Sequence, residues 1–216
     1  MNHSLLTEAG TAIVSDALDM LGYNNGLGSA ISPLTIGMKA VGPAYTLQVE
    51  PVAESESGKA GDYIDDVPAG SVIVIANRGE VECTVWGDIL SYVAKKKGIA
   101  GTVIDGACRD VDGIVELEYP VFSRACYMKS GKGRVSLKAQ NVPVLVGQTE
   151  VNPGDIVVAD GAGVLVIPAE HVEEVEALVS EIMEMEEKVL ALVDQGVALK
   201  AARNQLNYNK YGRKAK

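Results

Sequence analysis

The stretch over residues 86–110 constrains the fold more than any other and reads W-G-D-I-L-S-Y-V-A-K-K-K-G-I-A-G-T-V-I-D-G-A-C-R-D. It opens with apolar residues at helical spacing, which predicts a helix whose buried face is formed by Ile89, Leu90, Val93 and Ala94. Asp88 at its start and three lysines at its end suit the helix dipole, and Gly98 is suited to end it. The β-branched run 102–104 is too short for a second helix and predicts a buried strand. A helix followed directly by a buried strand indicates an α/β arrangement.

Residues capable of chemistry stand at the ends of both predicted elements. Free backbone N–H groups at the start of the helix, from Gly87 to Leu90, would form an anion site. Arg109 and Asp110 follow the strand: they form either a structural ion pair, or a site in which Arg109 binds carboxylate or carbonyl oxygens and Asp110 anchors a metal. Asp88 is likewise either a helix N-terminal acid or part of that site. Cys108, with no base beside it, is interpreted as a small buried thiol.

The remaining sequence predicts many strands, with helices near the start, middle and end. Helices are predicted at residues 7–22, 111–118 and 169–196, with one helical turn at 63–67. Strands are predicted at residues 40–49, 72–76, 121–126, 134–139, 142–146, 156–159 and 164–167. A hairpin-like turn is predicted at 77–80 and a mobile surface loop at 54–61. This order of elements indicates an α/β fold with a mixed sheet or layered sheets.

The long helix over residues 169–196 carries one charge in its apolar seam. In alternating steps of three and four, the seam runs through Val172, Val175, Val179, Ile182, position 186, Val189 and Val193. Position 186 is Glu186. Either the helical phase drifts there, with Met183 and Met185 covering the core, or a carboxylate is aimed at a neighbouring subunit or a polar site. The pattern alone leaves both interpretations open.

Composition narrows the chemistry. The net charge of −10 argues against nucleic acid as the main partner, since phosphate contacts need clustered Lys and Arg. There is no apolar run of about 18 residues for a membrane helix, no signal-peptide pattern, and no disulfide framework among the cysteines, which predicts a cytoplasmic protein. With two histidines and no P-loop or dinucleotide motif, carboxylate and arginine chemistry remains, which suits Mg²⁺ or Mn²⁺.

The same residues carry a resemblance to the RraA-like family. The stretch 86–110 resembles its signature, and other segments match in the same order: S-D-A-L-D-M-L-G, V-G-P-A-Y-T-L, P-A-G-S-V-I-V-I, Y-P-V-F-S-R, N-V-P-V-L-V-G and V-N-P-G-D-I-V-V-A-D-G-A-G-V-L-V-I-P. The resemblance implies an α/β fold, an RraA-like α/β/α β-sandwich related to swivelling domains, with mixed sheets and a long C-terminal helix. It implies a single catalytic domain over residues 1–196, followed at 197–216 by a basic extension with the composition of a flexible tail.

That family includes class II, metal-dependent 4-hydroxy-4-methyl-2-oxoglutarate/4-carboxy-4-hydroxy-2-oxoadipate aldolases. The resemblance implies a homotrimer or a dimer of trimers, with the active site between subunits. The substrate carboxylate would bind the backbone amides of Gly87, Asp88, Ile89 and Leu90. Arg109 would contact the keto or enolate oxygen, and Asp88 would join the hydration shell of the metal or take part in proton transfer. Asp110 would hold Mg²⁺ or Mn²⁺ largely through waters, and Glu186 of a neighbouring subunit would complete the metal site. Cys108 and Leu190 depart from the family pattern, which leaves the metal site intact and the substrate open.

The predicted function is a divalent-metal-dependent aldolase or lyase that cleaves a 4-hydroxy-2-oxo acid of the 4-hydroxy-4-methyl-2-oxoglutarate type to pyruvate, through a metal-stabilised enolate. The same chemistry would support oxaloacetate decarboxylase activity. The alternative is a non-catalytic RraA-type regulator that binds a ribonuclease or helicase. The presence of Asp88, Arg109, Asp110 and Glu186 favours the enzyme. The predicted partners are an oxo acid and further copies of the chain, without nucleic acid or membrane.

Overall fold

The computed structural model describes residues 3–52, 61–208 and 211. Its helices are α1 (Ser4–Leu21), η1 (Asp62–Asp66), α2 (Asp88–Lys97), α3 (Val111–Glu116), η2 (Ala169–His171), α4 (Val172–Asp194) and α5 (Leu199–Gln205), of which η1 and η2 are short 3₁₀ helices. Its strands are β1 (Ser32–Pro33), β2 (Ala40–Pro51), β3 (Val72–Ala76), β4 (Thr84–Trp86), β5 (Gly101–Cys108), β6 (Val121–Cys126), β7 (Val135–Gln140), β8 (Val144–Val146), β9 (Thr149–Val151), β10 (Ile156–Asp160) and β11 (Gly163–Ile167).

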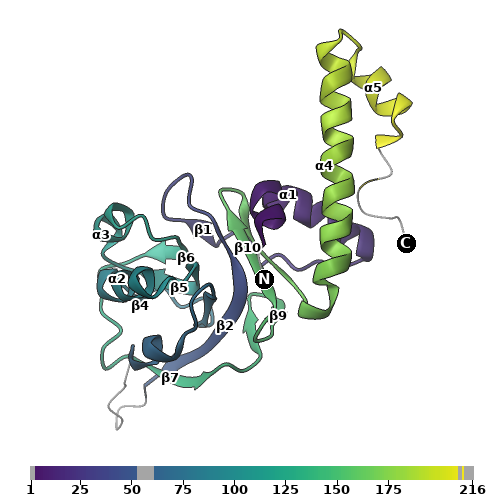
Figure 1. The fold of residues 1–216 in the computed structure, drawn as a ribbon. Helices are drawn as coiled ribbons and strands as arrows, with labels where there is room; N and C mark the ends of the chain where they lie inside the picture. Colours follow the sequence, from purple (N-terminus) through teal and green to yellow (C-terminus); the bar gives the residue numbers. More distant parts are fainter. Residues whose placement is uncertain (1–2, 53–60, 209–210, 212–216) are drawn as a thin grey trace.

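A nine-stranded mixed sheet forms the centre of the fold. Its main order is β1-β6-β5-β3-β2-β10-β11, with β4 on β5 and β7 on β2, while β8 and β9 pair separately. The curved strand β2 joins the two halves of the sheet (Figure 1), because residues 40–43 pair with β10 and residues 44–48 pair with β3. Gly42 lies at this change of partner, where a Cβ would be 2.2 Å from the carbonyl oxygen of Gly70. The predicted α/β class with a mixed sheet is confirmed.

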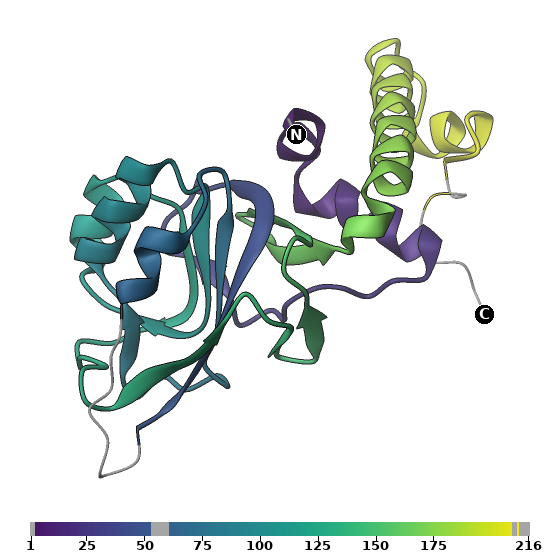
Figure 2. The same cartoon turned by 60° about the horizontal axis from the view of Figure 1, so that its bottom comes forward.

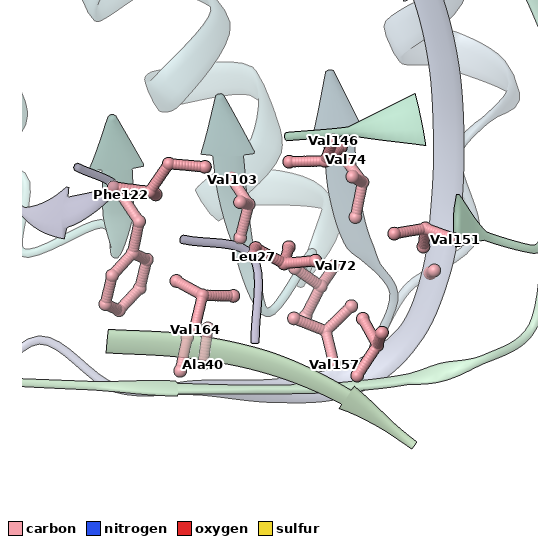
Figure 3. Packing of buried hydrophobic residues seen from close by; sticks show 14 of the residues in the cluster. Leu27, Ala40, Val72, Val74, Val103, Phe122, Val146, Val151, Val157 and Val164 are labelled. Carbon is pink, nitrogen blue, oxygen red and sulfur yellow. The ribbon is translucent and has the colours of Figure 1, made fainter. Parts of the chain in front are cut away.

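One apolar core fills the space between the two halves of the sheet. Figure 3 shows Val74 of β3, Val103 of β5 and Val157 of β10 converging on it. The alternate residues of β3, Ile73 and Ile75, belong to a second core on the opposite face. A strand buried on both faces has no polar side, which explains why β3 is a continuous apolar run in the sequence.

Helices cover the outer faces on two sides. α2, α3 and η1 enclose the second core, which includes Trp86 and Ile114. α1 and α4 enclose a third core over β10 and β11, which includes Val14 and Val179. Figure 1 and Figure 2 show these helical layers on opposite sides of the sheet. The predicted sandwich with a long C-terminal helix is therefore the observed fold.

Most predicted elements lie within a few residues of the observed ones. The strand predicted at 72–76 is β3, and the strand predicted at 102–104 is the centre of the longer β5. Gly98 ends α2 in the left-handed conformation, with φ 71°, as its position predicts. The short strands β1, β4 and β9 are not predicted from the sequence, because segments of two or three residues carry no measurable alternation.

Two local predictions are corrected by the structure. Ile89 is predicted on the buried face of its helix but is 73% exposed, whereas Leu90, Val93 and Ala94 do pack against the core, joined there by the buried Ser91. The turn at 77–80 forms, yet it joins no hairpin, because β3 and β4 each run parallel to β5 and do not pair with one another. The mobile loop predicted at 54–61 lies, apart from Gly61, outside the described residues.

A kink at Gly10 divides α1 and is held by a carboxylate from the sheet. Gly10 has φ 74° and ψ 175°, and a Cβ there would lie 2.8 Å from Oδ2 of Asp160. Asp160 accepts hydrogen bonds from the N–H and hydroxyl of Thr11, at 2.8 and 2.6 Å, and so caps the second segment of the helix. Burial acts to raise the pKa of Asp160, but these bonds and the Ala162 N–H outweigh it and lower the pKa.

Part of the C-terminal extension is helical. α5 packs against α4, and Ala202 is fully buried there. Within the predicted extension 197–216, residues 209–210 and 212–216 lie outside the described residues, and the predicted flexibility and domain boundary stay predictions. Among the helices of the described segments, none is both long enough and apolar enough to cross a membrane.

Candidate functional site

Arg109 and Asp110 lie at the carboxyl end of β5, beside the start of α2. The Arg109 N–H donates to the carbonyl of Trp86 at 3.1 Å, which ties the loop to β4. Cys108, the last residue of β5, is fully buried, and burial raises the pKa of its thiol to about 12. Cys108 is therefore the protonated buried thiol that the sequence predicts, and it leaves Arg109 and Asp110 as the polar groups of this loop.

The Asp110 carboxylate lies between Arg109 and the first residues of α2. Its Oδ2 is 3.2 Å from Nε of Arg109 and 3.5 Å from the backbone nitrogen of Asp88. Gly87 leaves room for it, since a Cβ on Gly87 would lie 2.6 Å from the same oxygen. The side chains of Arg109 and Asp110 are 34% and 36% exposed, so both are open to a ligand.

A buried hydrogen-bond network holds the start of α2. The indole N–H of Trp86 donates to the hydroxyl of Ser91 at 2.7 Å, and that hydroxyl donates to the carbonyl of Gly87 at 3.0 Å. Trp86 also stacks on Tyr119, with ring centroids 6.2 Å apart. Since these groups are buried and mutually bonded, they fix the backbone that faces Asp110.

The first N–H groups of α2 already face carboxylate oxygens of this chain. The N–H of Ile89 donates to Oδ1 of Asp88 at 2.7 Å, and the N–H of Asp88 points at Asp110. The positive end of the helix dipole favours such anionic partners. A ligand carboxylate that binds here would take the place of the exposed Asp88 side chain.

Asp110 has a backbone conformation that is uncommon for a residue with a side chain. Its φ of 58° and ψ of 38° lie in the left-handed region, where an L-residue other than glycine carries a cost of roughly 1–2 kcal/mol. Such residues cluster at functional sites, where the surrounding structure holds them in place. Here the conformation turns the chain from β5 into α3 and keeps the carboxylate beside Gly87.

The donor set suits a hydrated divalent cation. Within residues 3–52, 61–208 and 211, no group of three or more His, Cys, Asp and Glu side chains is placed to hold a metal ion. Asp88 and Asp110 supply hard carboxylate oxygens, and Mg²⁺ typically binds through one or two carboxylates while keeping several waters. The residues present fit such a cation, with coordination positions left for water, substrate or a second subunit.

The structure does not bring Glu186 to this site within one chain. α4 lies on the opposite side of the sheet from α2 and α3 (Figure 1, Figure 2). Glu186 is half-buried and accepts a hydrogen bond from the Tyr208 hydroxyl at 3.0 Å. Met183 packs against the third core, as the phase-drift interpretation expects. A role in a neighbouring subunit therefore stays a prediction.

Three residues that shape these surroundings are not visible in the sequence pattern. Ser91 is a buried polar residue on a helix face that periodicity assigns to apolar residues. Gly113 of α3 lies beside Asp88, and a Cβ there would be in ordinary contact with that of Asp88, at 3.5 Å. Tyr208 contacts Glu186 across 22 positions of chain, and no local signal links the two.

The chain belongs to the RraA-like family. The family model described as Aldolase/RraA matches residues 11–166, which include the whole stretch from Trp86 to Asp110 and end before Glu186. The fold and the family predicted from the sequence are both confirmed.

Similar proteins carry different names. Protein DlpA of Legionella pneumophila is 44% identical over 94% of this chain, which spans about a third of DlpA (33%). A protein of Halalkalibacterium halodurans named "Putative 4-hydroxy-4-methyl-2-oxoglutarate aldolase" is 38% identical, over 76% of this chain and 75% of its own length. The crystal structure of Streptomyces coelicolor RraAS2, described as an unusual member of the RNase ES inhibitor RraA protein family, has a TM-score of 0.79 and 30% identity. That match covers 85% of this chain and 93% of RraAS2.

Proposed function

We propose that this chain is a divalent-metal-dependent lyase that cleaves a 4-hydroxy-2-oxo acid to pyruvate. The observation that carries the proposal is the placement of the Asp110 carboxylate, 3.2 Å from Arg109 and against Gly87 at the start of α2. This arrangement offers an anion site, a guanidinium and a carboxylate within one small region. The relative named for 4-hydroxy-4-methyl-2-oxoglutarate aldolase supports this substrate class.

The residues of the chain take complementary roles in the proposed reaction. The N-terminal amides of α2 bind the carboxylate next to the 2-oxo group. Arg109 donates hydrogen bonds to the 2-oxo oxygen and stabilises the negative charge that develops there. As the bond between carbons 3 and 4 breaks, its electrons pass toward that oxygen, and the 4-hydroxyl loses its proton as carbon 4 becomes a carbonyl. The enolate that remains takes up a proton at carbon 3 to give pyruvate. Asp88, exposed at the edge of the site, is suited to take part in this proton transfer.

Asp110 would hold Mg²⁺ or Mn²⁺, directly or through water, with Asp88 nearby. A bound cation supplies positive charge that stabilises the developing oxyanion. Two carboxylates leave the cation incompletely held by one chain, so we propose that Glu186 of a neighbouring copy in a trimer, or a dimer of trimers, completes the site. Oxaloacetate decarboxylation would use the same groups, because it develops negative charge on the same oxygen.

Pyruvate release, followed through lactate dehydrogenase, tests this function. We expect release from 4-hydroxy-4-methyl-2-oxoglutarate to stop with EDTA and to return when Mg²⁺ or Mn²⁺ is added in excess. Arg109→Ala and Asp110→Ala should each remove most of the activity while the proteins remain folded. Full activity in either variant would contradict the proposed roles.

A second candidate function is a non-catalytic regulator of a ribonuclease or helicase. It is favoured by the similarity to RraAS2, whose title names an RNase ES inhibitor family, and by the net charge of −10. Binding to a purified ribonuclease tests this function. If the chain has no lyase activity but binds the ribonuclease, and Asp110→Ala binds it equally well, the regulator is favoured over the enzyme.

A further inference from the structure

The hydrogen bond between Tyr208 and Glu186 joins the C-terminal extension to the one charged position in the α4 seam. Ile182 and Val189 flank Glu186 on the same seam and are 1% and 6% exposed. The Glu186 carboxylate is therefore partly buried, and a partly buried carboxylate needs a hydrogen-bond partner. Tyr208 supplies one at 3.0 Å, to Oε1.

Tyr208 is itself held in place by α5. Ala202 of α5 is fully buried against the rest of the chain. The guanidinium of Arg203, one residue further, lies 4.7 Å from the centre of the Tyr208 ring, within the range of a cation–π contact. The phenol is thus a donor with a fixed direction, because helix packing and a ring contact both restrict it.

The partner of Glu186 is neutral, and this matters for a carboxylate that is to meet a cation. A lysine or arginine in the place of Tyr208 would form an ion pair and compete with the cation for the charge of Glu186. A phenol orients the carboxylate and leaves its negative charge in place. The side chain that approaches Glu186 from α1 is Asp16, which carries no positive charge either. Burial, Asp19 and Glu186 together raise the pKa of Asp16.

We propose that Tyr208 is a positioning residue, which orients Glu186 so that its second oxygen, Oε2, is directed to the metal of a neighbouring copy. The inference rests on the proposed function and adds to it a role for the C-terminal extension. Hydrogen bonds to ligating carboxylates act in this way at metal sites, and their loss typically weakens metal binding by roughly 10–100-fold. The family model ends at residue 166, so it does not cover either residue of this pair.

Mn²⁺ binding to the full chain, measured from the electron paramagnetic resonance signal of free Mn²⁺, tests the inference. We expect Tyr208→Phe, which keeps the ring and its packing, to weaken Mn²⁺ binding about tenfold, and Glu186→Gln to weaken it at least as much. Glu187→Gln, a change of an exposed neighbouring carboxylate on the same helix, should leave the affinity unchanged. The melting temperature of each variant reports whether it is folded.

The double variant separates positioning from a general structural role. If Tyr208 acts through Glu186, adding Tyr208→Phe to Glu186→Gln should cause no further loss of affinity. The inference would be overturned if Tyr208→Phe bound Mn²⁺ with wild-type affinity, or if the losses of the two single variants added in full in the double variant. Tighter Mn²⁺ binding by Tyr208→Phe would also overturn it, because Tyr208 would then restrain Glu186. In each case lyase activity of the unchanged chain would still support the proposed function. An unchanged chain that neither binds Mn²⁺ nor releases pyruvate would overturn both.

Discussion

Replacing Gly87 by alanine tests whether the position of the Asp110 carboxylate matters. A Cβ on Gly87 would lie 2.6 Å from Oδ2 of Asp110 and 3.5 Å from Nε of Arg109. The φ of Gly87 is −161°, in the extended region that alanine also adopts, so the backbone is not strained. The added methyl group must instead push the carboxylate away by about 1 Å. Misplacement on this scale costs roughly 100-fold in rate, or about 2.7 kcal/mol in activation free energy.

The assay is pyruvate release with Mg²⁺ in excess, run beside thermal unfolding. Gly87→Ala should lose about 100-fold in kcat/KM while its melting temperature changes little, since Asp110 is partly exposed and can move into solvent. Gly161→Ala is the matched control, because a Cβ there meets no atom within 4 Å and its backbone is not left-handed. Wild-type activity in Gly87→Ala would refute the reasoning, provided that Asp110→Ala is inactive.

Further predictions concern stability. Asp160→Ala removes the cap of α1 and should lower the free energy of unfolding by roughly 0.5–2 kcal/mol at pH 7, measured by urea denaturation. Because the folded pKa of Asp160 is below its ordinary value of 3.8, its contribution is complete above that value and is lost as the pH falls through the folded pKa, so wild type and variant should converge in acid. Ile75→Ala leaves a cavity in the core, because Ile75 is only 1% exposed, and should lower the free energy of unfolding by roughly 2–5 kcal/mol. Ile36→Ala, at a side chain that is 97% exposed, should change stability by less than about 0.5 kcal/mol.

The sequence predicts the central strands and the ends of the helices because those features are local. β3 appears as an apolar run since both of its faces are buried, and Gly98 ends α2 through its left-handed backbone. Helical spacing identifies an apolar face, but it does not say which residues at the edge of that face are covered by the rest of the fold. Ile89 is predicted wrongly for this reason. The exposed side of α2 begins at Ile89, while Ser91 turns inward to bond Trp86.

The candidate site is only partly visible in the sequence. Arg109 and Asp110 are neighbours in the chain, and their closeness to Gly87 follows from the parallel pairing of β4 with β5, which sets Trp86 beside Cys108. The left-handed conformation of Asp110 and the network through Ser91 depend on tertiary packing, which no spacing encodes. Glu186 is visible as a break in an apolar seam, but its bond to Tyr208 depends on how α5 folds back on α4.

The central claim is that Asp110 of one copy and Glu186 of another form one site, and subunit complementation tests it most directly. Asp110→Asn and Glu186→Gln should each be inactive alone. When the two variants are co-expressed in equal amounts and assemble at random, roughly a quarter of the sites regain both native carboxylates, so about a quarter of wild-type activity should return. Activity that does not rise above that of the separate variants, in a preparation shown to contain mixed assemblies, would contradict the account.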